Sequence, residues 1–69
     1  MTTYTAIIQA LAQGCTGKTR ALAQARNILR EVGAWYPQHD LEDAWSIMLQ
    51  DGRIIREGRE YRAKIGGAK

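Results

Sequence analysis

The chain has 69 residues, 45% of them hydrophobic, which is enough for one small domain (residues 1–69) and too few for a second. Its 10 Lys and Arg residues against 7 Asp and Glu give a net charge of +3. This charge is compatible with binding to nucleic acid, but it is far below that of a histone-like protein, so that class is excluded. Because the single Cys15 cannot form an internal disulfide, and no signal sequence or apolar membrane span is present, we expect a cytoplasmic protein without membrane contact.

The first predicted helix follows the opening threonines, which are favourable N-cap residues. Its apolar side chains recur at the i, i+3, i+4, i+7 spacing of one helical face, namely Tyr4, Ile7, Ile8 and Leu11. We expect this helix to end at Gly14, because glycine readily adopts the left-handed conformation of a helix C-terminus.

The second predicted helix begins after Thr16, runs to Val32 and stops at Gly33. One face is apolar and consists of Ala21, Leu22, Ala25, Ile28, Leu29 and Val32. A second set of residues at its start and on its flank has the chemistry to contact phosphates: Lys18, Thr19, Arg20, Arg26 and Arg30. The alternative is that these cations are simply solvated, as most exposed charges on helices are.

Pro37 interrupts the helical pattern, so Trp35 and Tyr36 are expected to pack on the core from a connecting segment.

A third helix is predicted with Asp40 as N-cap, Glu42 and Asp43 in the first turn, and Gly52 as its end. Its predicted buried stripe consists of Leu41, Ala44, Trp45 and Met48, broadened by Ile47 and Leu49. Two uncharged polar residues on this helix are suited to reading base edges, Ser46 and Gln50.

The last third of the chain predicts a β-hairpin that turns at Glu57-Gly58. This turn places Arg56 opposite Arg59, Ile54 opposite Tyr61, and Arg53 opposite Arg62. One face can then cover the core with Ile54, Tyr61, Ala63 and Ile65. Paired arginines destabilise an isolated hairpin, so they indicate a polyanionic partner; the alternative is that they protect a strand edge from aggregation. Residues 66–69 are expected to be a flexible tail.

The segment "AWSIMLQDGRIIREGREYRAKI", residues 44–65, resembles the recognition helix and wing of a winged helix-turn-helix domain. Within it, "REGREYRA" is similar to the wing of small excisionase and MerR-type DNA-binding proteins, many of which come from phages and mobile elements. The resemblance implies an α+β fold, with three helices followed by a C-terminal β-hairpin wing. It also implies duplex binding, with a helix in the major groove and the wing against the backbone or minor groove.

We therefore expect a duplex DNA-binding protein, either a small transcriptional regulator or a recombination accessory factor. The wing cations expected at the minor groove are Arg56 and Arg59, and those expected on phosphates are Arg53, Arg62 and Lys64. The alternative is a protein-interaction module, such as a phage-type inhibitor or adaptor. It is favoured by three carboxylates that a polyanion would repel, those of Asp40, Glu42 and Asp43. The same carboxylates leave a further alternative, in which the second helix approaches the DNA instead of the third, with Lys18, Arg20, Arg26 and Arg30.

No enzyme, metal site or cofactor is expected. The segment "AQGCTGKT", residues 12–19, formally matches a relaxed phosphate-loop pattern, but helical spacing precedes it where a phosphate loop needs a buried strand. Cys15 and His39 are the only thiol–imidazole pair, and nothing in the sequence brings them together. One Cys and one His are also too few for an ordinary structural zinc site.

Overall fold

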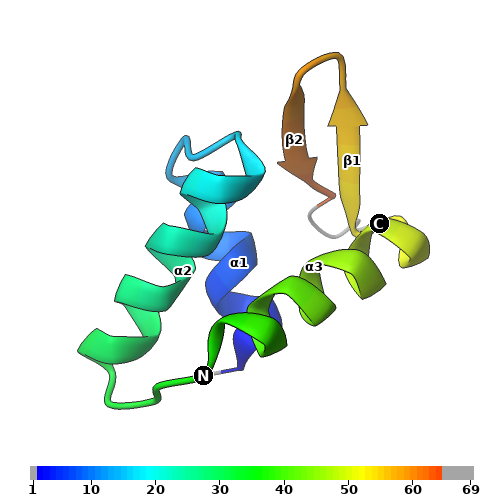
Figure 1. Cartoon of the computed structure of the whole chain (residues 1–69). Coiled ribbons are helices and arrows are strands. Elements are labelled where there is room, and N and C mark those ends of the chain that lie inside the picture. The colour runs from blue at the N-terminus through cyan, green and yellow to red at the C-terminus, as the bar shows by residue number, and fades with distance from the viewer. Residues whose placement is uncertain (1, 65–69) are drawn as a thin grey trace.

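The computed structural model describes residues 2–64 as three helices followed by a two-stranded antiparallel sheet (Figure 1). The elements are α1 (Thr3–Ala12), α2 (Lys18–Glu31), α3 (Gln38–Asp51), β1 (Ile54–Glu57) and β2 (Glu60–Ala63). The predicted α+β order of three helices and a C-terminal hairpin is confirmed. Ile65 and the predicted tail, 66–69, lie outside the described residues.

All three helices end in the same way, on a glycine with positive φ. At the end of α3, Gly52 has φ 81° and donates its N–H to the Leu49 carbonyl at 3.3 Å, while Arg53 donates to Met48 at 2.9 Å. These are the two bonds of a Schellman motif, which satisfies carbonyls that the helix end leaves free. The same pair of bonds closes α1 at Gly14 and α2 at Gly33, so the three predicted helix stops are confirmed.

The core lies where the three helices meet one face of the hairpin. Its largest fully buried side chains come from every helix and from β1, and are Trp45, Ile7, Leu29, Leu41, Met48 and Ile54. Each of the three predicted apolar faces contributes to this core, and Tyr36 packs against it as expected.

Three apolar residues expected in the core are instead exposed. Val32 is 55% exposed because it is the C-cap of α2, already beyond the regular helix. Trp35 is 59% exposed on the segment that connects α2 to α3, and Ile47 is 42% exposed on the flank of α3. The predicted burial of these three side chains is wrong.

The predicted start of α3 is also wrong. The N-cap is Pro37, with φ −68° and ψ 159°, and the helix begins at Gln38 rather than after Asp40. Proline suits this position because its ring fixes φ and its missing N–H removes a donor that the helix start would leave free. Asp40 therefore lies in the first turn, and Glu42 and Asp43 lie in the second.

The hairpin turns at Gly58-Arg59, one residue later than predicted. The strand pairs are Ile54–Ala63, Ile55–Arg62, Arg56–Tyr61 and Glu57–Glu60. A Glu57-Gly58 turn of type I′ would need positive φ at Glu57, whereas the observed turn needs it at Gly58, where φ is 65°. The predicted arginine pairs, Arg56 with Arg59 and Arg53 with Arg62, are therefore absent from the described hairpin, and Ile54 does not face Tyr61.

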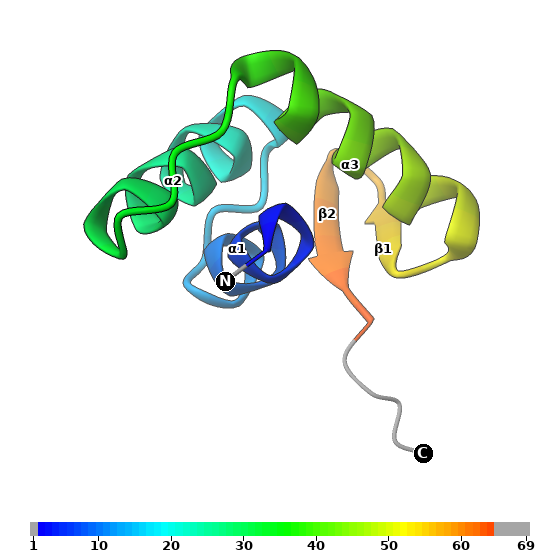
Figure 2. The ribbon, with the colours of Figure 1, turned by 90° about the horizontal axis from the view of Figure 1, so that it is seen from below.

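The hairpin is attached to the helices by one face. Ile54, Tyr61 and Ala63 share that face and pack on the core, as predicted. Figure 2 shows α1 lying between α2 and β2, and α1 contacts both. The backbone N–H of Tyr61 donates to the Thr16 carbonyl at 2.9 Å, which ties β2 to the segment that leads into α2.

Candidate nucleic-acid interface

Two of the predicted phosphate-binding arginines have acidic partners within the chain. The Arg53 guanidinium lies 3.2 Å from the Asp51 carboxylate and 5.5 Å from the centroid of the Tyr4 ring. The guanidinium of Arg62 pairs with Glu57 at 3.0 Å, diagonally across the hairpin. Both ion pairs are solvent-exposed and so are weak. They nevertheless balance the charge of these two arginines locally.

The cations at the hairpin tip have no carboxylate partner among residues 2–64. Arg56 donates from Nε to the Gly58 carbonyl at 3.1 Å, a neutral acceptor, although the exposed carboxylates of Glu57 and Glu60 flank the same turn. Arg59 is exposed in the turn itself, and Lys64 is exposed just after β2. The tip therefore presents two guanidinium groups that can accept an anionic partner.

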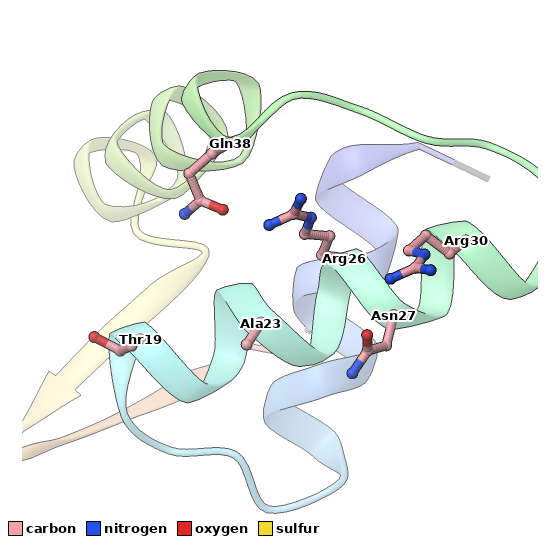
Figure 3. Close-up of a pocket in the computed structure, with 6 residues that line it drawn as sticks. All are labelled: Thr19, Ala23, Arg26, Asn27, Arg30 and Gln38. Carbon is pink, nitrogen blue, oxygen red and sulfur yellow. The ribbon is translucent and has the colours of Figure 1, made fainter.

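The basic flank of α2 is formed as predicted. Thr19, Arg26 and Arg30 line an open groove of about 390 Å³ between α2 and the start of α3. Figure 3 shows Arg26 extending from α2 toward the side of the groove on which Gln38 lies. Ala23 and Asn27 complete the lining, which contains no carboxylate group. The groove therefore favours an anionic ligand electrostatically.

The start of α2 brings two further cations next to the hairpin. Lys18 and Arg20 are exposed in the first turn of α2, and they follow closely on Thr16, whose carbonyl accepts from β2. Figure 1 shows the start of α2 and the hairpin at the same end of the molecule. Within the described part of the chain, no lysine or arginine of α2 belongs to an ion pair. The start of α2 and the hairpin are thus joined at the Thr16–Tyr61 hydrogen bond, and both elements carry exposed cations without an ion pair among the described residues.

The outer side of α3 has the opposite charge. Ser46 and Gln50, the predicted base-reading residues, are exposed, and Asp43 stands three residues before Ser46 on the same face. Glu42, one turn after Gln38, accepts from the Gln38 side-chain amide at 3.4 Å and so lies at the rim of the groove. α3 therefore carries carboxylates and no lysine or arginine, whereas α2 carries the cations together with one exposed carboxylate, that of Glu31 at its last residue.

Other chemistries find little support in the described residues. The segment at 12–19 follows α1 rather than a strand. His39 is 75% exposed and pairs with Asp40 at 3.2 Å, while Cys15 is half-buried. Over residues 2–64, no group of three or more His, Cys, Asp or Glu could hold a metal ion, and none of the helices has the length and apolarity to cross a membrane.

Sequence reasoning missed three residues of the groove: Ala23, Asn27 and Gln38. The helical positions of Ala23 and Asn27, between the predicted cations of α2, were a usable signal. Gln38 was beyond reach because the start of α3 was misplaced.

The chain matches no protein-family model, no curated protein and no solved structure.

Proposed function

We propose that this protein binds duplex DNA through α2 and the hairpin tip, and that it acts as a small transcriptional regulator or recombination accessory factor. The observation that carries the proposal is that the cations of these two elements, which meet at the Thr16–Tyr61 hydrogen bond, have no ion pair among the described residues. Their positive charges attract phosphates, and each phosphate contact releases counterions from the duplex. The hairpin then serves as the wing of a winged helix-turn-helix-like domain.

The basic residues of α2 have a spacing that suits a nucleic-acid backbone. From Lys18 to Arg30 the helix rises by about 18 Å, at about 1.5 Å per residue. Successive base pairs of a duplex are about 3.4 Å apart along its axis, so this length spans about five base pairs. In the proposed complex, Arg26 and Arg30 contact phosphates on one side of the DNA major groove, and Arg56 and Arg59 contact the neighbouring minor groove of the DNA.

The proposal assigns smaller roles to Arg53 and Arg62 than the sequence suggested. Each must give up its bond to Asp51 or Glu57 before it can hold a phosphate, and the carboxylate left behind would then repel the DNA. Lys64 remains a candidate phosphate contact beside the hairpin.

The experiment is fluorescence anisotropy of a labelled mixed-sequence duplex, titrated with the protein between about 50 and 200 mM salt. Duplex binding that weakens steeply with salt supports the proposal. The double variant Arg26→Ala/Arg30→Ala should flatten the slope of log K against log[salt] by about two units, at about 0.9 per lost phosphate contact. Arg53→Ala is the control and should change the slope much less. No binding at the lowest salt would overturn the proposal.

A protein-interaction module is the second candidate. It is favoured by the exposed side chains of Trp35 and Ile47, together with the exposed carboxylates of Glu42 and Asp43. An aromatic residue beside charged groups is a common composition for a protein interface. If the duplex titration fails, Trp35→Ala and a native pull-down are the next measurements for this candidate.

A further inference from the structure

We infer that α2, rather than α3, is the helix that reads base edges, and that Asn27 is its central base-reading residue. The inference rests on the proposed duplex binding and adds to it a specificity-determining residue. The expected partner is adenine. The side-chain NH₂ group of asparagine can donate to N7 of adenine while its carbonyl oxygen accepts from the N6 amino group, and both adenine groups lie on the major-groove edge.

The position of Asn27 on α2 is the first support. It lies two residues from both Ala25 and Leu29, which are fully buried, and so it points away from the core. It is exposed and lines the groove with Arg26 and Arg30. Asn27 is therefore at the middle of the outer surface of α2, with a guanidinium group beside it and another one turn further on.

The side chains around Asn27 allow a close approach. Ala23, one turn earlier, is exposed and carries only a methyl group, so it leaves room for the base edges in a DNA major groove to come near the helix. Arg26 and Arg30 are long enough to reach outward to phosphates while the shorter Asn27 side chain stays close to the helix axis. Recognition helices combine short polar base-reading residues and flanking phosphate contacts in this way.

The amide of Asn27 has no structural task within the described residues. It makes no side-chain hydrogen bond there, unlike Gln24, whose amide donates to Gln13 at 2.9 Å. Asparagine is a poor helix former in the middle of a helix, because its side chain competes for backbone hydrogen bonds. The exposed asparagine therefore weakens α2 locally without a compensating contact among the described residues, and its amide is free to bond a base.

The charges around the polar residues of α3 differ from those around Asn27. Its uncharged polar residues, Ser46 and Gln50, share their face with Asp43, whose carboxylate would approach the phosphates in any pose that brings Ser46 to a base. Around Asn27, Arg26 and Arg30 line the groove between α2 and α3, and the carboxylate of Glu31 lies one turn further along α2, where it lines a second pocket with Asn27 and Arg30. Two arginines therefore stand against one carboxylate near Asn27, whereas α3 carries Asp43 beside Ser46 and contains no lysine or arginine, so electrostatics favours α2 as the inserted helix.

The test is selection of preferred duplexes from a random library by the full-length wild-type protein, followed by affinity measurements on variants. We expect a preference that includes an adenine. Asn27→Ala should abolish the preference at that position and lower the affinity for the selected duplex by about 5- to 150-fold, while leaving the affinity for unselected DNA and its salt slope unchanged. Alanine is the better helix former, so this variant will fold, and circular dichroism verifies it.

Ser46→Ala and Gln50→Ala are the matched variants on α3, and they should leave the preference intact. Loss of the preference in these variants, with Asn27→Ala behaving as wild type, would overturn the inference in favour of α3. A wild-type protein that binds duplex but selects no sequence would also overturn it while leaving the proposed function standing. Absence of any duplex binding would instead refute the proposed function, on which the inference depends.

Discussion

The ring of Tyr61 lies edge-to-face against the indole of Trp45, with centroids 4.9 Å apart and an interplanar angle of 73°. Trp45 is buried in α3 and Tyr61 belongs to β2, so this pair attaches the hairpin to the helical core. The backbone N–H of the same tyrosine donates to Thr16. Tyr61 therefore connects the hairpin both to α3 and to the segment that precedes α2.

Replacement of Tyr61 should loosen the hairpin. Tyr61→Ala is expected to lower the free energy of unfolding by about 1–3 kcal/mol, less than for a fully buried aromatic residue because Tyr61 is only half-buried. Tyr61→Phe keeps the ring and should stay within about 1 kcal/mol of wild type. Urea unfolding monitored by circular dichroism measures both. Equal stability of Tyr61→Ala and wild type would show that the ring pair does not hold the hairpin in place.

The hairpin turn can be tested with two glycine substitutions. Gly58→Ala should destabilise the protein by about 1–2 kcal/mol, since alanine is strained at the φ of 65° found there. Glu57→Gly should also destabilise it, by about 0.5–1 kcal/mol, because glycine is more flexible than other residues in a strand. The substitution also removes the carboxylate that forms the ion pair with Arg62. Thermal unfolding of the two variants gives the answer. A gain in stability from Glu57→Gly would instead indicate that the turn begins at residue 57.

Two arginines of the hairpin, one without and one with an acidic partner, should differ in their effect on DNA affinity. Arg59→Ala removes an unpaired tip cation and should reduce the salt slope of binding by about one unit. Arg62→Ala removes a charge already balanced by Glu57 and should reduce it by clearly less. Parallel anisotropy titrations at several salt concentrations compare them. Equal losses would show that the ion pair opens on binding and that both arginines contact phosphates.

Two carboxylates of α3 distinguish the helix that faces the DNA. Glu42 lies at the rim of the α2 groove through its bond with Gln38, so Glu42→Gln should tighten duplex binding. Asp43 lies on the outer face of α3, turned away from the groove, so with α2 on the DNA its charge is further from the phosphates than that of Glu42 and is screened more by salt. Asp43→Asn should thus change the affinity little. The reverse order of the two effects would place α3 against the duplex.

Much of the helical part of the fold was predictable because its causes are local. Apolar spacing identified the buried faces of the helices, and Gly14, Gly33 and Gly52 marked their ends, since a helix stop depends on the φ of one residue. The basic flank of α2 was predictable for the same reason. Side chains three or four residues apart share a helical face whatever the rest of the chain does.

The sequence by itself therefore determined the order of elements, the helix ends and the presence of cations on α2 and the hairpin. Only the tertiary structure decided which cations remain unpaired, because Arg62 meets Glu57 only in the register that turns at Gly58. It also decided that Trp35 is exposed and that Gln38 faces Arg26 across a groove. The first outcome depends on the hairpin register, which a shift of the turn by one residue changes. The other two depend on how segments distant in sequence pack together, and such packing leaves no periodic signal in the chain.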